Sequence, residues 1–311
     1  MSKSPDLSII IGTYNSKNIT LRTLSSLYAH RKHISFEVIV IDDASTDDSF
    51  AAIKRKFSKV RMYRNDKNLG YSKTYNRGTK LARGRYILHL NSDVTFTRES
   101  HLDSLVKFMD SHKNIGVVGC KVLKHDGHLD LPCRHAIPTL ANVLFQMFGL
   151  HMLFPRWKTT NYYMTYLDIN QSTEVGGILG AFMFIRRSVI KKIGYLDEKF
   201  YMYCEDTDFC YRTIKAGWKV FYYPKVTIRH IHGGTSQQFR FKAVILFHLG
   251  MLHYYNKHHK RKSSVGLNTC VYLGLLLRFS LYMTIEIVRR LIVHLQTAMM
   301  SMAERGRNVR I

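Results

Sequence analysis

Acidic residues are scarce in this sequence. Its 311 residues include 22 Asp and Glu against 47 Lys and Arg, which gives a formal net charge of +25 at pH 7. A positive field of this size attracts nucleic acids, anionic lipid headgroups and phosphorylated substrates. The charge alone does not choose among these three kinds of partner.

Cysteine is also rare, and its spacing excludes two kinds of site. There are five cysteines, an odd number without a C-x-x-C pair: Cys120, Cys133, Cys204, Cys210 and Cys270. Neither a disulfide framework nor a zinc knuckle is therefore predicted, and a reducing compartment fits best. The apolar run at residues 7–11 is too short for the core of a signal peptide, so we expect the chain to begin in the cytosol.

The patterns of several well-known domain classes are missing as well. There is no RNP-type, K-homology or helix-turn-helix pattern, so we expect no nucleic-acid partner despite the positive charge. The turn after the first apolar run reads G-T-Y-N. It is neither the G-x-G-x-x-G of a dinucleotide oxidoreductase nor the glycine-rich basic loop of a nucleotidyltransferase.

Apolar runs alternate with helical patterns through the first half of the chain. Strands are predicted at residues 7–11, 36–41, 60–64 and 85–90, and helices at residues 17–30, 46–57 and 71–82. Ser45 is expected to open the second of these helices. Strands joined by crossover helices predict an α/β fold with a doubly wound, mostly parallel sheet and helices on both faces.

Polar residues follow three of these strands. They are Thr13 and Tyr14 after the first strand, Asp42 and Asp43 after the second, and Asn91, Ser92 and Asp93 after the fourth. In such sheets the ligand binds at the carboxyl ends of the strands. Asp42 and Asp43 could accept hydrogen bonds from a pyrimidine N–H and ribose hydroxyls, and Asp93 could hold a divalent cation that bridges two phosphates. Any one of these acids could be an ordinary turn residue, but their convergence favours a ligand site.

A second acidic cluster follows a buried-strand pattern at residues 178–186. Glu205, Asp206 and Asp208 lie at the start of a predicted helix that runs to about residue 216. Capping accounts for one acid at a helix N-terminus, but three exceed that need. A carboxylate at this point, ionised at neutral pH, could take the proton of a sugar hydroxyl.

A short strand predicted at residues 226–231 ends in a segment with two histidines. A lone histidine is more often structural than a ligand. Beside a metal held by Asp93, however, a histidine here is a candidate ligand, expected to be neutral at cytosolic pH. His230 and His232 both lie in this segment.

Six motifs in this order resemble glycosyltransferase family 2, whose members have the GT-A type fold. They are SIIIGTYN, VIVIDDASTDDS, NLGYSKTYNRG, YILHLNSDV, the long run from GAFMFIRRS to CYRTIKAGW, and HIHGGTS. Together they cover residues 7–236. Six motifs in the family's order make the resemblance specific, whereas LNSDV or IDDAS alone would be weak.

The resemblance implies a role for each motif residue. Thr13, Tyr14, Asp42 and Asp43 would bind the nucleotide of the donor, together with Asn91 and Ser92. Asp93 would coordinate Mg²⁺ or Mn²⁺, and His230 matches the position of a second metal ligand better than His232. Asp206 takes the position of the general base, and Glu205 beside it is the other catalytic residue of the family's Glu-Asp pair.

The implied activity is an inverting transfer of a sugar from a nucleotide diphosphate to a hydroxyl of a membrane-linked glycan or polyprenyl-diphosphate-linked acceptor, in cell-surface polysaccharide synthesis. The segment LPCRHAIPT at residues 131–139 resembles rhamnosyltransferase-like members that use dTDP-L-rhamnose, and UDP-sugars remain open. Residues between 133 and 180 should read the sugar. The alternative is an inactive family member that serves as a binding or scaffold subunit. It rests on Asn91, which stands where the acidic motif normally begins with aspartate.

The chain is expected to divide near residue 238. Residues 1–238 would form the catalytic domain, with a nucleotide-sugar half at about 1–95 and an acceptor half at about 96–238. Residues 239–311 form a helical extension with the cationic run KHHKRK at 257–262 and an apolar stretch at 265–302. We expect this extension to lie on the anionic inner face of the cell membrane. The protein would then be cytoplasmic and peripherally associated with that membrane. A helix packed on the catalytic domain and a membrane span are the alternatives.

Overall fold

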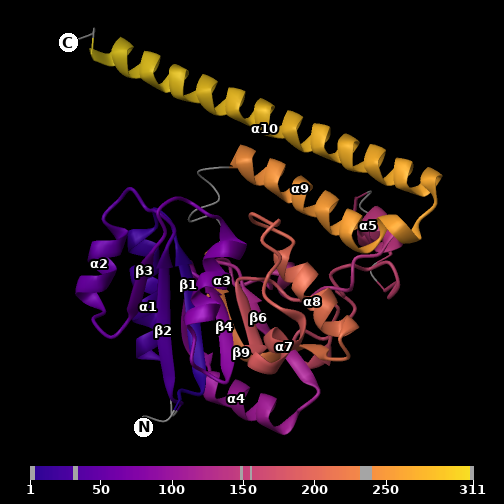
Figure 1. Ribbon diagram of the computed structural model, residues 1–311. Coiled ribbons are helices and arrows are strands. Elements are labelled where there is room, and N and C mark those ends of the chain that lie inside the picture. The colour runs from indigo at the N-terminus through magenta and orange to yellow at the C-terminus, as the bar shows by residue number, and fades with distance from the viewer. Residues whose placement is uncertain (1–3, 31–33, 148–149, 155, 232–239, 309–311) are drawn as a thin grey trace. The chain divides into compact units, whose positions relative to one another are not determined.

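The computed structural model describes residues 4–30, 34–147, 150–154, 156–231 and 240–308 (Figure 1). His232 lies outside these residues. The chain forms two compact units, residues 1–238 and 239–311. The first contains a β-sheet with helices, and the second contains two long helices.

The N-terminal unit is built on one mixed sheet. Its described strands are β1 (Leu7–Thr13), β2 (Phe36–Asp42), β3 (Arg61–Arg64), β4 (Tyr86–Asn91), β5 (Val94–Ser100), β6 (Ile115–Leu123), β7 (Thr173–Glu174), β8 (Phe182–Arg186) and β9 (Lys219–His230). Their order is β3-β2-β1-β4-β8-β6-β9-β5, and β7 pairs with β9. Strands β1 to β4 run parallel, as the alternating pattern predicts, whereas β8 runs antiparallel to both β4 and β6.

Helices connect these strands. They are α1 (Lys17–Ala29), α2 (Ser49–Lys56), α3 (Tyr71–Leu81), α4 (Leu102–Ser111), α5 (Leu140–Met147), α6 (Leu150–Leu153), α7 (Arg187–Ile193) and α8 (Glu205–Lys215). The prediction that Ser45 opens α2 is wrong, because α2 begins at Ser49. The buried Ser45 hydroxyl instead accepts a hydrogen bond from the Asn15 N–H at 3.0 Å.

The strand predicted at residues 178–186 is shorter in the structure. Strand β8 begins only at Phe182, whose N–H donates to the Leu179 carbonyl at 3.2 Å in a turn. Just before it, the Gly180 N–H donates to the Asp206 carboxylate at 2.8 Å. The Gly180 N–H therefore bonds to α8 and not to a neighbouring strand.

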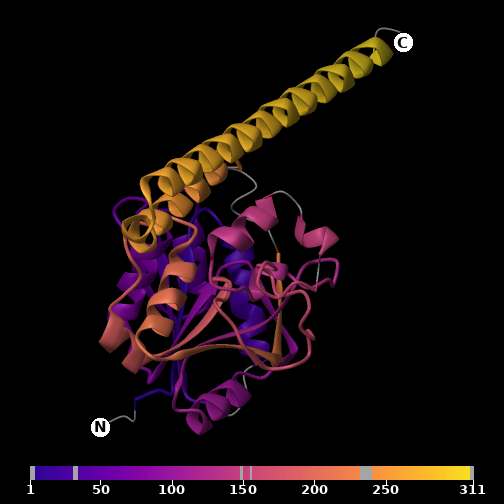
Figure 2. The same ribbon diagram turned by 90° about the vertical axis from the view of Figure 1, so that its right-hand side faces the viewer.

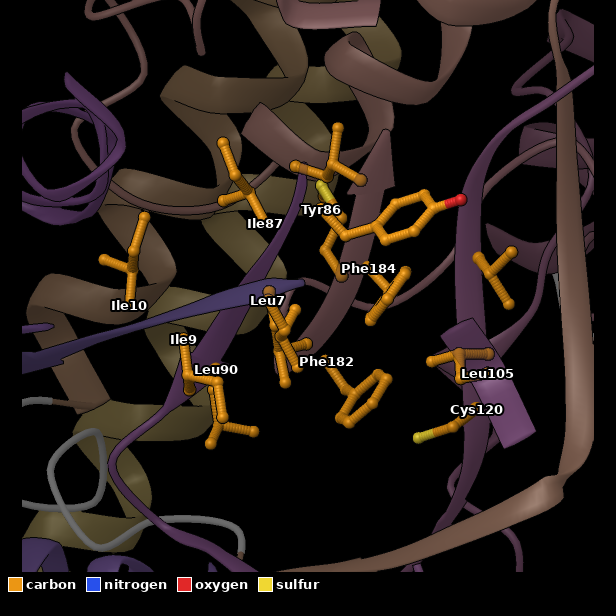
Figure 3. Close-up of a cluster of buried hydrophobic side chains, with 14 of the residues drawn as sticks. Leu7, Ile9, Ile10, Tyr86, Ile87, Leu90, Leu105, Cys120, Phe182 and Phe184 are labelled. Carbon is orange, nitrogen blue, oxygen red and sulfur yellow. The ribbon is translucent and has the colours of Figure 1, made fainter. Parts of the chain in front are cut away.

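Both faces of the sheet are covered. Successive strand residues point to opposite faces, yet every residue of β1 from Leu7 to Ile11 is buried. Figure 3 shows how side chains of β1, β4 and β8 gather in this core; the labelled ones include Ile9, Leu90 and Phe182. Burial of such side chains contributes about 1.5–3 kcal/mol each and makes the sheet a rigid platform.

Helix α3 lies unusually close to the sheet. A Cβ atom at Gly78 would overlap the Ile10 side chain of β1, so the absence of a side chain allows this approach. At the start of the same helix, Gly70 has φ +79° and a Cβ there would lie 2.5 Å from the Tyr201 carbonyl oxygen. These two glycines place the N-terminus of α3 against the chain segments that carry the predicted site.

The C-terminal unit is an antiparallel pair of helices, α9 (Arg240–His258) and α10 (Val265–Asn308) (Figures 1 and 2). Polar side chains join them along their length. Tyr255 donates to Asn268 at 2.8 Å, Tyr272 donates to Asn256 at 2.8 Å, and Arg278 lies 3.2 Å from a ring nitrogen of His248.

Helix α10 exposes a long apolar surface. Leu273, Leu277, Leu281 and Ile285 recur every four residues and are 53–71% exposed. Within the described residues, the stretch Val265–Val293 has a mean hydropathy of 1.6 and is long and apolar enough to cross a membrane. By length and composition, therefore, this helix suits a lipid environment.

Candidate active site

Asp43 organises the edge of the sheet after β2. Its carboxylate accepts hydrogen bonds from the Asn65 side-chain amide at 2.7 Å, the Leu69 N–H at 2.9 Å and the Gly70 N–H at 3.0 Å. Its own N–H donates to the Thr13 carbonyl at 2.8 Å. Asp43 thus ties the end of β1 to the loop that leads into α3.

Asp42 is buried beside it with an incomplete set of partners. One carboxylate oxygen lies 3.3 Å from the Ser45 N–H and 3.3 Å from the Arg64 guanidinium. The other oxygen has no hydrogen-bond partner among the described residues. Burial raises the pKa of this carboxyl because it penalises the charged form, and the unpartnered oxygen is itself sealed from solvent.

The residues after β1 shape the same edge. The Thr13 hydroxyl lies 2.8 Å from the Ser16 hydroxyl and 2.9 Å from the Thr20 hydroxyl, which gives it a packing role at the start of α1. Tyr14 is half-buried. The Asn15 side chain accepts a hydrogen bond from the Thr46 N–H at 2.7 Å and so holds the following loop. Donor contacts by Thr13 and Tyr14 stay predictions.

Asp93 and His230 form a close pair. An Asp93 oxygen lies 3.0 Å from His230 Nε2, and an Asp130 oxygen lies 3.6 Å from Nδ1 on the other side of the ring. Although burial opposes the charge, these two carboxylates raise the pKa of His230 to about 9. Without a metal this arrangement favours the protonated ring. The neutral imidazole expected beside a metal held by Asp93 stays a prediction.

A metal ion at this pair would draw on few protein ligands. The described residues contain no group of three or more His, Cys, Asp or Glu suited to hold a metal. Asp93 and His230 offer one carboxylate oxygen and one ring nitrogen. Divalent ions that act on phosphates are commonly held by one or two carboxylates together with the phosphates themselves, so this small set of ligands fits such an ion. Binding would displace the His230 proton.

Two tyrosines of α3 connect the strand ends to α8. The Tyr71 hydroxyl donates to the Gly180 carbonyl at 2.8 Å, and the Tyr75 hydroxyl donates to the Leu90 carbonyl at 2.8 Å. Their rings stack with centroids 4.0 Å apart. The tyrosine pair therefore spans from β4 to the segment before β8.

The predicted acids surround this pair. Burial raises the pKa of Tyr71, and the nearby Glu205 and Asp206 carboxylates raise it further. Burial raises the pKa of Tyr75, and the Asp93 and Glu205 carboxylates raise it further. Acids far apart in the sequence thus act on one pair of rings, as expected for a shared site.

Helix α8 begins with Glu205 and Asp206. An Asp206 oxygen accepts the Gly180 N–H at 2.8 Å. Glu205 is only 5% exposed, one of its oxygens lacks a partner among the described residues, and burial together with Asp206 raises its pKa well above the usual range. This favours a protonated Glu205 at neutral pH. The preceding Tyr203 and Cys204 both have positive φ, at 74° and 67°.

The third acid of this cluster has a structural role. Asp208 is fully buried and its carboxylate accepts a hydrogen bond from Arg212 at 2.8 Å. Arg212 also donates to the carbonyls of Ile193 and Tyr195 at 2.9 and 2.8 Å. Asp208 therefore fastens α8 to the end of α7.

The turn between β4 and β5 is held by its backbone. The Asn91 N–H donates to the Ala181 carbonyl at 3.0 Å, and its side-chain oxygen lies 3.5 Å from the Tyr75 hydroxyl. The Ser92 carbonyl accepts the Thr23 hydroxyl at 2.6 Å. Both residues thus fix the position of Asp93, and their contact with a donor stays a prediction.

Sequence reasoning missed the residues that join these parts. Tyr71 and Tyr75 lie four residues apart, which places them on one helix face, and both belong to the motif NLGYSKTYNRG. That spacing was a readable signal. The pairing of Gly180 with Asp206, and of Asp130 with His230, depends on tertiary structure and has no such signal.

The chain matches known proteins in sequence and in fold. The sequence profile of glycosyl transferase family 2 matches residues 8–194. The N-acetylglucosaminyl-diphospho-decaprenol L-rhamnosyltransferase of Mycobacterium tuberculosis (strains CDC 1551 and H37Rv) is 28% identical over 242 residues, which cover 72% of this chain and 75% of that protein.

Solved structures share the fold. The mannosyltransferase PcManGT from Pyrobaculum calidifontis, in complex with GDP-Man and Mn²⁺, has a TM-score of 0.58 at 15% identity over 82% of this chain and 65% of its own. GalNAc-T7 with UDP, GalNAc and Mn²⁺ has a TM-score of 0.55 at 17% identity over 75% of this chain and 45% of its own. These likenesses confirm the predicted GT-A type fold.

Replacement of Asp43 by Asn should destabilise the protein. Both oxygens of Asp43 accept N–H groups, so the amide nitrogen of Asn would face a donor in either orientation. We expect a loss of about 1–3 kcal/mol in the free energy of unfolding, measured by urea denaturation. Asp48→Asn removes a charge at an exposed ion pair with Lys17 and should cost much less, because solvent screens such a pair. Equal losses would contradict the role given to Asp43.

Proposed function

The chain belongs to glycosyl transferase family 2, and we propose that it transfers a sugar with inversion from a nucleotide diphosphate to a hydroxyl of a polyprenyl-diphosphate-linked acceptor. The observation that carries the mechanism is the placement of Asp206. Its carboxylate is fixed by the Gly180 N–H next to the stacked Tyr71 and Tyr75 rings, and Asp93 lies close enough to Tyr75 to raise the pKa of that tyrosine.

Asp206 is the general base of this proposal. It takes the proton of the acceptor hydroxyl while that oxygen bonds to the anomeric carbon, and the bond from this carbon to the diphosphate oxygen breaks with its electron pair leaving on the diphosphate. The Gly180 N–H holds one carboxylate oxygen, so the base keeps its orientation. Attack from the side opposite the leaving group inverts the anomeric carbon without a covalent enzyme intermediate.

Asp93 and His230 are the proposed ligands of Mg²⁺ or Mn²⁺. A bound divalent ion supplies charge neutralisation for the departing diphosphate. Asp93 is positioned by the turn after β4, and its carbonyl accepts the Ile231 N–H at 2.9 Å. This bond keeps the end of β9, and with it His230, next to Asp93.

The donor side rests on Asp42 and Asp43, which we propose bind the nucleotide together with Thr13 and Tyr14. Asp42 ends β2 and Asp43 follows it, at the carboxyl edge of the parallel strands, where ligands of such sheets bind. The L-rhamnosyltransferase relative and the segment LPCRHAIPT support dTDP-L-rhamnose as donor, with UDP-sugars as the other class. The N-acetylglucosaminyl-diphospho-decaprenol acceptor of the same relative supports a sugar-diphospho-polyprenol acceptor.

The purified protein should transfer rhamnose from dTDP-L-rhamnose to N-acetylglucosaminyl-diphospho-decaprenol, measured as product by mass spectrometry. A parallel panel of UDP-sugars tests the other donor class. Transfer from UDP donors alone would exclude rhamnose. A protein that binds nucleoside diphosphates but transfers from no donor would instead support the inactive scaffold, for which Asn91 is the sequence argument.

Asp206→Asn should lower kcat by about 10²–10⁴-fold, because Asn cannot take the proton, while binding of dTDP stays unchanged. Turnover and calorimetric binding measure the two effects. Asp208→Asn is the matched comparison, since it removes the partner of Arg212 and should lower stability more than catalysis. Full activity of the Asp206 variant would exclude it as the base.

Chelation of divalent ions should abolish transfer, and added Mn²⁺ or Mg²⁺ should restore it. His230→Ala and Asp93→Ala should each raise the metal concentration needed for half-maximal activity, because each removes a ligand. His128→Ala, at an exposed histidine, serves as the control. Activity that survives prolonged chelation would remove the metal from the proposal.

We further propose that the protein is cytoplasmic and that residues 239–311 bind the anionic inner face of the cell membrane. Two features of the C-terminal unit support this. Lys260, Arg261 and Lys262 are exposed in the turn between α9 and α10, and α10 exposes its apolar side chains. Cations attract anionic headgroups, and exposed apolar side chains partition into the lipid interface.

Replacement of Lys260, Arg261 and Lys262 by Gln should weaken binding to vesicles that contain phosphatidylglycerol, by on the order of 1 kcal/mol per charge. Sedimentation with vesicles measures it, and added salt should weaken the wild type in the same way. The triple Gln variant of Lys54, Arg55 and Lys56, an exposed run of the same composition in α2, is the matched control. Equal binding by both variants would argue against the cluster.

A further inference from the structure

The segment LPCRHAIPT contains two buried side chains that the proposed mechanism does not use. After the 3-10 turn Leu131–Cys133, Arg134 is 1% exposed and His135 is 4% exposed. A buried cation and a buried imidazole in an irregular segment need partners, and the two residues meet this need differently.

Arg134 is satisfied by the protein itself. Its guanidinium donates to the Asp168 carbonyl at 2.7 Å and to the Leu167 carbonyl at 2.6 Å, and it lies 4.9 Å from the centre of the Tyr222 ring. It therefore fastens the segment around residues 167–168 next to β9. This explains Arg134 as structural and leaves its neighbour to be explained.

His135 presents one nitrogen that the protein does not occupy. Its Nδ1 lies 2.9 Å from the Ala136 carbonyl oxygen, and since a carbonyl only accepts, Nδ1 carries the proton. Burial lowers the pKa of the ring, which keeps it neutral, so Nε2 is left as an acceptor. Nε2 makes no hydrogen bond within the described residues. It does not belong to the unpartnered polar atoms that are fully shielded from solvent, so it keeps some accessible surface.

The ring is packed against two neighbours. It stacks on Tyr162 with centroids 4.9 Å apart, and a Cβ atom at Gly177 would overlap the imidazole, so the ring packs directly on the glycine backbone. The His135 N–H donates to the Gly177 carbonyl at 3.0 Å. Such a fixed acceptor suits recognition of a ligand better than a mobile side chain does.

The same glycine-rich segment leads from His135 to the base. Gly177 contacts the imidazole, and three residues later the Gly180 N–H holds the Asp206 carboxylate. Asp206 also acts electrostatically on His135 without a direct hydrogen bond. A ring acceptor and a carboxylate acceptor therefore lie near each other, joined by the backbone from Gly177 to Gly180. A sugar ring carries hydroxyl groups on adjacent carbons and could donate to both.

We propose that His135 Nε2 accepts a hydrogen bond from a sugar hydroxyl next to the reacting position, and so helps to select the sugar. This deepens the proposed function and rests on it. The sugar belongs either to the nucleotide donor or to the acceptor, and both present the same chemistry. Two binding measurements separate them.

The test compares His135→Asn with His135→Gln in the full chain. Asn can keep the hydrogen bond to the Ala136 carbonyl but lacks an acceptor at the Nε2 position, whereas the longer Gln can place its amide oxygen near that position. If the sugar is the donor's, His135→Asn should weaken binding of dTDP-L-rhamnose about tenfold with dTDP binding unchanged. If it is the acceptor's, the variant should raise the KM for N-acetylglucosaminyl-diphospho-decaprenol about tenfold. His135→Gln should recover most of either loss.

A variant that is merely misfolded would lose dTDP binding and thermal stability as well. His135→Phe keeps an aromatic ring stacked on Tyr162 but has no acceptor, so it should lose sugar recognition while it keeps thermal stability and dTDP binding. Wild-type values for His135→Asn in both measurements would overturn the proposal, as would an equal loss for dTDP and dTDP-L-rhamnose. If the wild-type protein itself binds no nucleotide sugar and transfers none, the proposed function fails. If it transfers sugar and His135→Asn behaves like it, only this inference fails.

Discussion

The backbone of Gly180 is the constraint on which the candidate site depends. Its N–H holds the Asp206 carboxylate, and its carbonyl accepts the Tyr71 hydroxyl. A Cβ atom there would lie 3.3 Å from both the Asp206 oxygen and the Tyr71 oxygen, tighter than most real contacts. One residue without a side chain thus sets the distance between the acids of α8 and the helix that carries the tyrosine pair.

The rest of the fold brings partners to this point. Gly78 lets α3 approach β1, Gly70 lets it approach the Tyr201 backbone, and Asp43 fastens the loop between β3 and α3. The antiparallel entry of β8 beside β4 then places Gly180 next to the carboxyl ends of the parallel strands. Two halves of the chain with different strand directions therefore share one working edge of the sheet.

Much of this could be predicted from the sequence, for identifiable reasons. Buried strands are apolar on both faces, so β1 and β2 appear as short apolar runs, and polar residues directly after them fall at the sheet edge. The start of α2 was misplaced because Ser45 resembles a helix cap, whereas its hydroxyl is used by Asn15. Nothing local distinguishes these two uses of a serine.

Charge states were harder to predict than positions. The pKa of His230 is raised partly by Asp130, which is distant in sequence and becomes its neighbour only through folding. Asp206 and Asp208 look alike in the motif, and only the contact with Arg212 shows that the second is structural. Asp208 and Arg212 are four residues apart on one helix, so the sequence could have predicted an intrahelical ion pair between them.

The hydrogen bonds to Asp43 affect the entropy of ligand binding at this edge of the sheet. An ionised carboxylate offers about four acceptor positions, and three donors of the protein already occupy Asp43. A ligand that reaches this group adds a last bond to a preorganised cage and freezes few additional torsions. Association at this edge should therefore carry a small entropic penalty and a lock-and-key character.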